Sequence, residues 1–326
     1  MDQMLLQVEN LTMRYNTRSP FRNSANSVCA VDDISFSIPR GAIMGLIGES
    51  GCGKTSVGKT LLCLTPPTAG RVFFDGKVIF DVEKNSFLPP KELQKIRKQM
   101  QIVFQDPYSA LDPKRTILQT VSEGAVKHRL VSRKAAYGYA QHYLQMCGIP
   151  ESALLRYPHE FSGGQRQRIN IARSLALQPE FLVCDEITAA LDVSIQSQIL
   201  NLLLDLREQQ KLTMLIISHN IDVVRYLCDF VAVMYLGKIV EMADAKTLYE
   251  SPAHPYTQAL LAAIPKREPW EADKKLTLQK QISQAAQIPG GCRFLPRCPR
   301  CTQQCTGCAP SLQELQPNHF VACWNV

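Results

Sequence analysis

Short apolar or β-rich runs alternate with runs of helical spacing over the first 250 residues. The run at 195–206 is an example: Ile195, Ile199 and Leu202 recur on one face of a helix. Such alternation predicts a layered α/β fold built on a sheet. The expected strands are residues 5–13, 30–38, 43–47, 101–104, 181–184, 213–217 and 231–235, and residues 71–80 are β-rich around a turn at Asp75-Gly76. The expected helices are residues 55–64, 91–100, 116–128, 133–147, 195–206 and 257–263.

The character of the sequence changes twice along the chain. Residues 106–160 are polar and rich in helical spacing, without a convincing strand, which predicts a helical subdomain inserted into the sheet. After residue 250, prolines punctuate a linker-like stretch, and polar residues lead into a cluster of cysteines. We therefore expect a first domain at 1–250, with its helical subdomain at about 106–160, and a C-terminal extension at 251–326. Residues 16–28, rich in Ser, Asn and Arg, predict an exposed loop.

Composition and charge narrow the class of protein. The 326 residues are 45% hydrophobic and 20% charged, which is ordinary for a globular protein. No apolar run approaches the ~18 residues that a membrane-spanning helix needs. No secretory leader is recognised at the N-terminus, so we expect the chain to stay in the cytosol. The net charge of +7 is diffuse and argues for neither nucleic acid nor lipid as a partner.

One stretch matches the complete phosphate-binding loop pattern G-x-x-x-x-G-K-T, and it lies between an expected strand and an expected helix, as the pattern requires. Its glycines allow backbone N–H groups to turn inward toward an anion at the helix N-terminus. Lys54 is expected to reach the outer phosphates, and Thr55 to bind Mg²⁺. A Gly-rich turn that matches by chance is the alternative, which the motifs downstream disfavour. The stretch is Gly48-Glu49-Ser50-Gly51-Cys52-Gly53-Lys54-Thr55.

Two acids, Asp185 and Glu186, follow the buried strand expected at 181–184. A carboxylate at this place can hold Mg²⁺ opposite Thr55, and its neighbour can polarise an attacking water. Strands that end in acids are common. The presence of a phosphate-binding loop upstream in the same chain favours the functional interpretation.

A second anion site is indicated where Ser162 is placed as an N-cap before two glycines at the start of a helix. A capped helix after a turn would look the same. The run Phe161-Ser162-Gly163-Gly164-Gln165 nevertheless resembles the signature motif of ATP-binding-cassette nucleotide-binding subunits. In that family, the signature serine and glycines contact the γ-phosphate of ATP bound by the opposite subunit.

The resemblance implies a fold and further site residues. The implied fold is a P-loop NTPase domain with a RecA-like core, an antiparallel β subdomain, the inserted helical subdomain and a Cys-rich extension. Glu186, His219 and Gln105 are the implied catalytic residues, and Asp192 matches the D-loop aspartate. Thr55, Gln105 and Asp185 are the implied Mg²⁺ ligands, and Gly163, Gly164 and Gln165 join Ser162 in contacting the partner's ATP. The implied ATP-binding residues are Tyr15, Gly48, Glu49, Ser50, Gly51, Cys52, Gly53, Lys54, Thr55 and Ser56.

The chain departs from the family pattern after the two acids. Ile187 stands where the family usually has proline, and it lacks proline's fixed φ. Ala189 stands where the family has a hydroxyl-bearing serine. Both acids are intact, so we expect ATPase activity, while the path of the D-loop is left open.

Four segments resemble the ATPase subunits of oligopeptide, dipeptide and nickel importers, and this chain resembles the second, F-type subunit. The resemblance implies a peripheral protein on the cytoplasmic face of the bacterial plasma (inner) membrane, which hydrolyses ATP to energise import of peptides or of nickel and metal chelates. Its partners would be a second ATPase subunit in a head-to-tail heterodimer, two transmembrane permease subunits and, indirectly, an extracytoplasmic substrate-binding protein, but no nucleic acid. Two alternatives are a soluble cassette ATPase of translation or DNA repair, and a metal-binding regulatory protein with a vestigial ATPase. The segments are 156–161, 192–196, 234–241 and 252–257.

Half of the twelve cysteines crowd into residues 292–323. In a cytosolic protein such a cluster favours a metal site over disulfides. The spacing C-x5-C-x6-C-x17-C of Cys292, Cys298, Cys305 and Cys323 matches the family's C-terminal pattern, and the resemblance favours a [4Fe–4S] cluster. Cys301 and Cys308 are alternates that would also suit Zn²⁺, and unligated thiols are the remaining alternative. Because this tail is far in sequence from every phosphate-binding motif, we expect a structural or partner-docking role for it.

Overall fold

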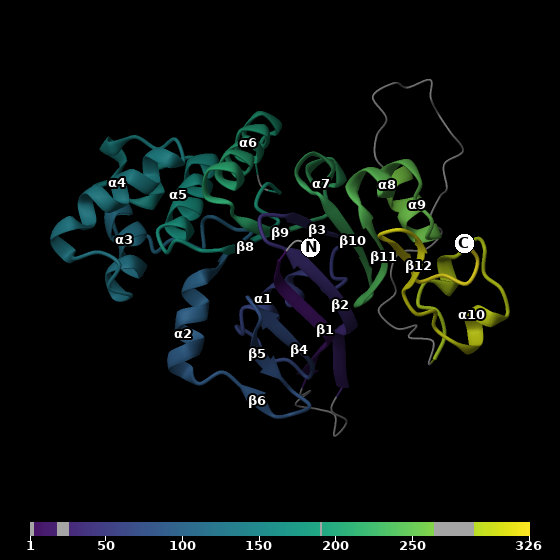
Figure 1. The fold of residues 1–326 in the computed structure, drawn as a ribbon. Helices are drawn as coiled ribbons and strands as arrows, with labels where there is room; N and C mark the ends of the chain where they lie inside the picture. The colour runs from purple at the N-terminus through teal and green to yellow at the C-terminus, as the bar shows by residue number, and fades with distance from the viewer. Residues whose placement is uncertain (1–2, 18–25, 190, 264–289) are drawn as a thin grey trace.

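Two β-sheets lie at the centre of the protein, with helices around them (Figure 1). The structure is a computed structural model, and it describes residues 3–17, 26–189, 191–263 and 290–326. Within these ranges the α/β fold predicted from the sequence pattern is confirmed.

The larger sheet has the strand order β12-β13-β11-β10-β3-β9-β8-β7, and the five strands β10, β3, β9, β8 and β7 run parallel to one another. Every residue of β3, β8 and β9 is buried, as expected for strands covered on both faces. Because β3 and β8 are parallel and separated only by β9, their carboxyl ends lie at one edge of the sheet. The strands are β3 (Ile43–Ile47), β7 (Met100–Val103), β8 (Phe181–Asp185), β9 (Thr213–Ser218), β10 (Phe230–Tyr235), β11 (Lys238–Asp244), β12 (Gln313–Gln316) and β13 (His319–Val321).

The smaller sheet is antiparallel, with the order β2-β1-β4-β5-β6. β1 and β2 are longer than the sequence predicts, since their pairing continues to Thr17 and Asn26, inside the expected loop at 16–28. The middle of that loop, 18–25, lies outside the described residues. The strands are β1 (Met4–Thr17), β2 (Asn26–Pro39), β4 (Ala69–Phe74), β5 (Lys77–Asp81) and β6 (Ser86–Phe87).

Three helices, α3, α4 and α5, pack on one another at one side of the larger sheet, on the left in Figure 1. They share one buried apolar cluster with β3, β8 and β9, through residues such as Ile117, Leu144 and Ile169. The helices are α1 (Lys54–Leu61), α2 (Pro90–Gln99), α3 (Ile117–Lys127), α4 (Ala136–Met146), α5 (Gly163–Leu175), α6 (Val193–Gln210), α7 (Ile221–Leu227), α8 (Ala245–Glu250), α9 (Pro255–Ala262) and α10 (Gln304–Gly307). Single 3₁₀ turns are η1 (Arg133–Ala135), η2 (Glu151–Ala153), η3 (Pro158–Glu160) and η4 (Leu295–Arg297).

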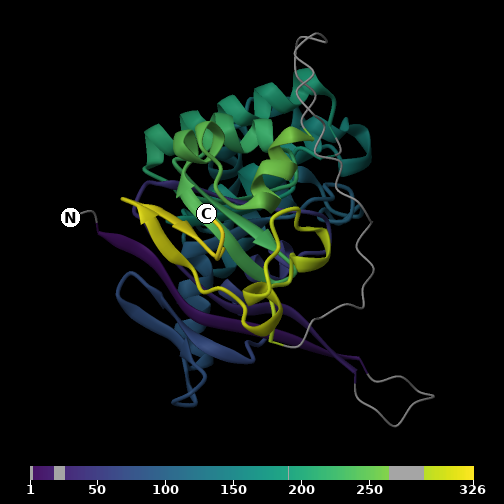
Figure 2. The same ribbon diagram turned by 90° about the vertical axis from the view of Figure 1, so that its right-hand side faces the viewer.

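The C-terminal extension joins the larger sheet, since β13 pairs with β11 in antiparallel register (Figure 2). Glu241 of β11 is fully buried, and its carboxylate lies 2.7 Å from Nε2 of the buried His319 of β13. The same carboxylate accepts backbone hydrogen bonds from Ala253 and His254. One buried carboxylate therefore ties the start and the end of the extension to the strand of the first domain, and each of its oxygens has a partner.

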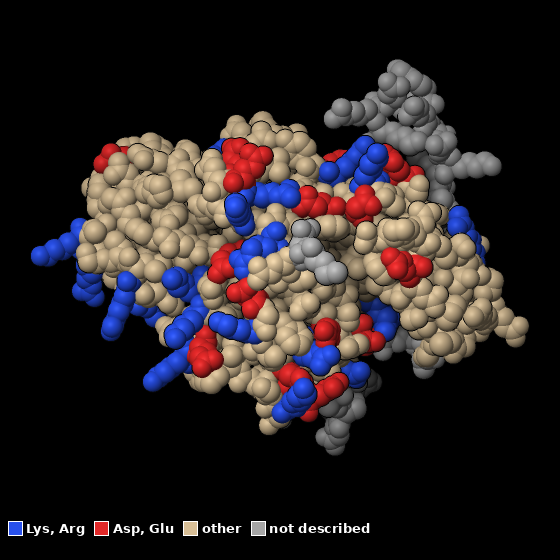
Figure 3. Space-filling model, viewed as in Figure 1, with Lys and Arg blue, Asp and Glu red and all other residues tan. Residues whose placement is uncertain are grey.

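None of the helices in the described ranges is long and apolar enough to cross a membrane. Acidic and basic side chains are interspersed over the face seen in Figure 3, with Lys and Arg projecting along its lower left edge.

Candidate active site

The phosphate-binding loop connects β3 to α1, as the sequence predicts. Gly48 and Gly53 adopt φ angles of 153° and 111°. A Cβ atom at Gly48 would lie 2.1 Å from the carbonyl oxygen of Met234, and one at Gly53 would lie 2.0 Å from that of Ala30. Both glycines are therefore required by close backbone neighbours as well as by their conformation.

Lys54 is almost fully buried, and its ammonium group turns back over the loop. Its Nζ donates hydrogen bonds to the carbonyl oxygens of Gly48, at 2.7 Å, and Glu49, at 3.0 Å. The positive charge is thus held inside the concave side of the loop. An anion that binds there meets the ammonium group together with the backbone N–H groups at the start of α1.

Asp185, at the end of β8, meets the first turn of α1. Thr55 Oγ1 donates a hydrogen bond of 3.0 Å to Asp185 Oδ1, although the two residues are 130 positions apart. Burial raises the pKa of the Asp185 carboxyl, and the hydrogen bond from Thr55 opposes this shift. The pair places two hard oxygen donors side by side, which is the ligand chemistry that Mg²⁺ prefers.

Glu186, the next residue, is approached from two other elements. Gln105 Nε2, just after β7, donates a 3.0 Å hydrogen bond to Glu186 Oε2. His219 Nδ1, just after β9, lies 3.2 Å from the same oxygen. Gln105 and His219, the other two residues predicted to be catalytic, therefore both contact the Glu186 carboxylate at the edge of the sheet. The backbone of Glu186 has φ of 48°, and its N–H donates to Ile217 of β9, which fixes where the side chain starts.

Tyr15 lies at the rim of this site. Its hydroxyl is 3.2 Å from Ser56 Oγ on α1, and the side chain is 38% exposed. An aromatic ring in this position, next to the helix that follows the phosphate-binding loop, is accessible to a planar base.

The signature residues lie at the start of α5, on the side of α3 and α4 (Figure 1). Ser162 caps the helix, and its side chain and that of Gln165 form a reciprocal capping box. A Cβ atom on Gly164 would lie 2.5 Å from Ile195 Cγ2 of α6, so this contact requires glycine. The printed side-chain hydrogen bonds of Ser162 and Gln165 stay within this turn, and Ser162 is exposed.

The segment after Glu186 is held without the proline and serine of the family pattern. Ile187 is buried in the core, and Ala189 N donates to the carbonyl oxygen of Glu186. Gln196 Nε2 of α6 donates to the carbonyl oxygens of Thr188 and Leu191. Asp192 caps α6 through its backbone position and leaves its carboxylate exposed.

The C-terminal extension contacts the phosphate-binding loop, a contact that sequence reasoning missed. Both terminal nitrogens of Arg297 donate hydrogen bonds to the carboxylate of Glu49, at 2.9 and 2.8 Å. Tyr256 Oη accepts a hydrogen bond of 2.9 Å from the backbone N–H of Glu49. The hydrogen bond with Glu49 raises the pKa of Arg297 still further. Arg293 bonds to Asp32 of β2 and to the carbonyl oxygen of Leu236. The only signal in the sequence was the segment 252–257, which indicated a subfamily but no contact.

A small aromatic core supports these contacts. Phe294 is buried and lies 5.3, 5.6 and 5.7 Å, between ring centroids, from Tyr235, Tyr256 and His254. Burial lowers the pKa of His254 to about 4, so its ring is neutral and Nδ1 accepts the N–H of Tyr256. Apolar packing thus fixes η4, and with it the position of Arg297.

The cysteine cluster is only partly as expected. Burial raises the pKa of Cys292, Cys298 and Cys323, and the charges of other cysteines in the cluster act in the same direction. For Cys305, burial opposes ionisation, yet hydrogen bonds involving Thr302 and Asn325 leave its pKa below the usual value. Within the described ranges, however, no group of three or more His, Cys, Asp or Glu side chains is arranged to hold a metal ion. The predicted iron–sulfur ligands Cys292, Cys298, Cys305 and Cys323, and the alternates Cys301 and Cys308, are therefore not supported as a metal site.

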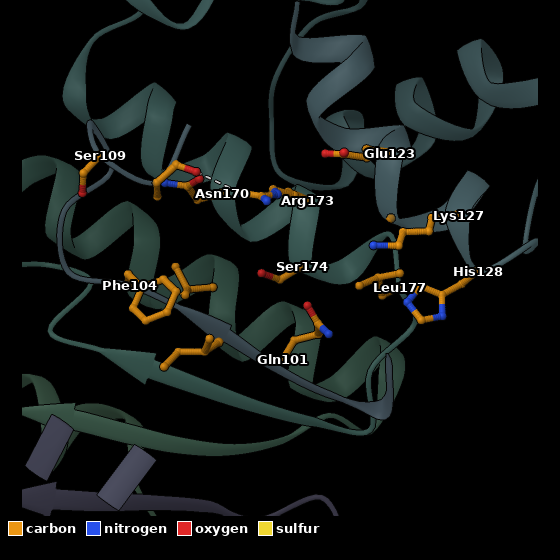
Figure 4. Close-up of a pocket in the computed structure, with 14 residues that line it drawn as sticks. Gln101, Phe104, Ser109, Glu123, Lys127, His128, Asn170, Arg173, Ser174 and Leu177 are labelled. Atoms are coloured by element: carbon orange, nitrogen blue, oxygen red, sulfur yellow. Dashed lines mark hydrogen bonds between the residues drawn. The ribbon is translucent and has the colours of Figure 1, made fainter. Parts of the chain in front are cut away.

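A groove of about 630 Å³ lies between β7 and the helices α3 and α5 (Figure 4). Its wall combines polar and charged groups with apolar ones, and Arg173 is anchored across it by a hydrogen bond to the carbonyl oxygen of Ala110. Burial, followed by the charges of Lys98 and Lys127, lowers the pKa of His128 at one end. The lining residues labelled in Figure 4 are Gln101, Phe104, Ser109, Glu123, Lys127, His128, Asn170, Arg173, Ser174 and Leu177.

Comparison with known proteins gives consistent matches. Residues 31–189 match a family described as ABC transporter, and residues 240–305 match one described as the C-terminal region of oligopeptide/dipeptide transporters. A putative peptide import ATP-binding protein of Brucella ovis is 44% identical, over 98% of this chain and 97% of that protein. The oligopeptide transport ATP-binding protein AppF of Bacillus subtilis is 41% identical, over 98% and 96%.

Solved structures agree with these matches. The dimeric ATP-binding cassette MJ0796, in a post-hydrolysis state with ADP and phosphate, has a TM-score of 0.64 and 28% identity, covering 74% of this chain and 98% of that one. The protein cbiO1 of Clostridium perfringens, part of the transporter complex cbiONQ, also has a TM-score of 0.64, with 30% identity over 77% of this chain and 92% of that one.

Proposed function

The chain belongs to the family of ATP-binding-cassette transporter ATPases, in the branch of peptide import subunits, and we propose that it hydrolyses ATP to drive import of peptides through a membrane transporter. The observation that carries this proposal is the convergence of Gln105 and His219 on Glu186, next to the Thr55–Asp185 pair and the phosphate-binding loop. Nickel or a metal chelate is the other cargo that the resemblance allows.

In the proposed mechanism, the phosphate-binding loop and Lys54 hold the phosphates of ATP, and Tyr15 stacks on the base. Thr55 and Asp185, with Gln105, would hold Mg²⁺ through their oxygens, and the bound ion would neutralise charge on the phosphates. Glu186 orients the attacking water and accepts its proton. Gln105 and His219 hold the Glu186 carboxylate in place, because both contact its Oε2 oxygen.

We propose that the active unit is a head-to-tail pair of ATPase subunits. Ser162, Gly163 and Gly164 form the N-terminus of α5, where Ser162 is exposed and its side chain accepts the N–H of Gln165, while Gly164 is buried. Such a terminus favours an anion such as the γ-phosphate of ATP on the partner subunit. The dimeric form of the related cassette supports pairing of two such subunits. The partner in this chain's case would be a second, different ATPase subunit.

The groove between β7 and α3 and α5 is the proposed docking site for a transmembrane permease subunit. Its lining includes Phe104, the residue before Gln105, and residues of the signature helix α5. A permease segment bound in the groove would therefore be displaced when either Gln105 or α5 moves. Replacing Leu177 by glutamate would place a charge in the groove. Leu177→Glu is expected to weaken copurification with the permease subunits, with Leu155→Glu, at a 68% exposed position outside the groove lining, as its control.

The protein would lie at the cytoplasmic face of the plasma membrane, held there by the permease subunits. The extension enters this proposal as a protein module, without a metal-dependent step. A [4Fe–4S] cluster or Zn²⁺ on its cysteines stays a prediction, supported by the family spacing but not by a formed site among the described residues.

ATP hydrolysis by the chain assembled with its copurifying subunits tests the function. Phosphate release that depends on Mg²⁺ and rises when the cargo and its binding protein are added would support a peptide importer. Hydrolysis that responds instead to ribosomes or DNA would support the soluble alternative, and no hydrolysis at all would support a vestigial ATPase. The full-length match to peptide import subunits favours the first outcome.

A further inference from the structure

The phosphate-binding loop carries a negative charge of its own. Glu49 occupies the second position of the loop, between Gly48 and the residues that line the helix N-terminus. ATP brings several negative charges to the same loop. An unpaired carboxylate there would repel the phosphates, because like charges held on one short loop are close together.

Arg297 of the C-terminal extension neutralises that carboxylate. The two terminal nitrogens of its guanidinium match the two oxygens of Glu49 in the fork geometry that arginine makes with carboxylates. Only 8% of the arginine side chain and 23% of the glutamate side chain are exposed, so solvent screens the pair far less than a surface ion pair. The two residues are 248 positions apart, so the pair exists only because the extension folds back onto the first domain.

The extension also holds the backbone of the same residue. Tyr256 Oη accepts the N–H of Glu49, and the Glu49 carbonyl oxygen accepts from Lys54 and from Cys52. Tyr256 and Phe294 are fully buried against Tyr235, which limits how far either contact can shift. Glu49 is thereby fixed through both its side chain and its main chain by residues beyond position 250.

We infer that Arg297 is a positioning residue for the ATP site: it cancels the charge of Glu49 and holds that side chain away from the phosphates, so that the C-terminal extension sets the affinity of the loop. This inference rests on the proposed function, since it requires that the loop bind ATP. It gives the extension a role at the nucleotide, although the distance in sequence predicts only a structural or partner-docking role.

A charge series on the full-length chain tests the inference, with the dissociation constant for MgATP measured by titration calorimetry. The Glu49–Arg297 pair contributes no net charge in the native chain, +1 in Glu49→Gln, −1 in Arg297→Ala and zero in the double variant. We expect Arg297→Ala to weaken ATP binding about tenfold, Glu49→Gln to strengthen it about threefold, and the double variant to return to within about twofold of the native chain. Arg300→Ala, in the same module but bonded to Gln258 rather than the loop, is the matched control and should leave affinity unchanged.

The dissociation constants of the same variants for ADP and AMP provide a second test. The effect of the Glu49 charge on these constants should decrease as phosphates are removed, because the charge repulsion decreases. Native affinity in Arg297→Ala would overturn the inference. Weak binding that Glu49→Gln does not restore would also overturn it, because the extension would then act through folding alone. If Arg297→Ala does not fold, the Glu49→Gln arm decides: loss of affinity rather than gain contradicts the charge argument. A native chain that binds no ATP would instead defeat the proposed function itself.

Discussion

Replacing Glu186 by glutamine removes one charge from the site and almost nothing else. The amide has the shape of the carboxylate, and Gln105 and His219, which both contact Oε2 in the native chain, remain beside it. The backbone at this residue is held by the N–H of Glu186 donating to Ile217, a bond the variant keeps. What is lost is the oxygen that can accept a proton from water, because an amide is a very poor base.

The magnitude follows from that loss. General-base catalysis contributes about 10²–10⁴ in rate, so turnover in the assembled complex should fall by that factor, equivalent to about 2.7–5.5 kcal/mol on the barrier. ATP binding should change by less than about twofold, because the phosphates are held by Lys54 and the loop rather than by Glu186. Phosphate release measures the first quantity, and binding of a fluorescent ATP analogue measures the second.

Glu208→Gln is the matched control, since it makes the same chemical change at an exposed position of α6. It should leave both quantities at their native values. Turnover of Glu186→Gln within about threefold of the native complex would refute the role of Glu186 as the base. Loss of ATP binding in the same variant would instead show that the carboxylate contributes to holding nucleotide.

Four further outcomes are expected. Lys54→Ala should weaken ATP binding itself, measured by the same analogue, because it removes the ammonium group from the loop; unchanged affinity would contradict that role. Ser162→Arg should block hydrolysis by the complex while this chain still binds ATP, and loss of only its own nucleotide would contradict the head-to-tail arrangement. Phe294→Ala should lower the free energy of unfolding by about 3–5 kcal/mol in denaturant melts, against less than about 0.5 kcal/mol for Leu315→Ala at a 44% exposed position, and equal effects would show that the aromatic core is not structural. Metal analysis of the anaerobically purified chain tests the cysteine cluster: a [4Fe–4S] cluster requires iron and acid-labile sulfide that Cys298→Ser loses, zinc alone would indicate a zinc site, and absence of metal would agree with the described residues, which form no metal site.

The segment after Glu186 is held by contacts that its own residues do not reveal. The sequence showed that Ile187 and Ala189 depart from the pattern, and left the path of the loop open. In the structure, burial of Ile187 and two hydrogen bonds from Gln196 to backbone carbonyl oxygens hold the segment. Those bonds come from the next helix, so a reading of the loop residues alone could not have found them.

Strand length shows a similar limit. The run 5–13 predicts a strand by its own residues, but β1 continues to Thr17 because β2 lies beside it and pairs with it. The short strand β13 was not predicted at all, since three residues carry no period of their own. Its hydrogen bonds to β11 and the buried Glu241–His319 contact make it part of the sheet.

The sequence alone determined the α/β fold and predicted the residues of the nucleotide site, because those signals are local: a glycine loop between strand and helix, acids after a buried strand, a capped glycine turn. It also predicted that Glu186, Gln105 and His219 share a task, through the resemblance of their motifs. Only the tertiary structure decided that one oxygen of Glu186 receives both partners, because parallel strand order brings the ends of β7, β8 and β9 to one edge. Only the tertiary structure joined Arg297 to Glu49, because a contact over 248 positions depends on where β11 and the aromatic core place the extension, and no nearby residue encodes that.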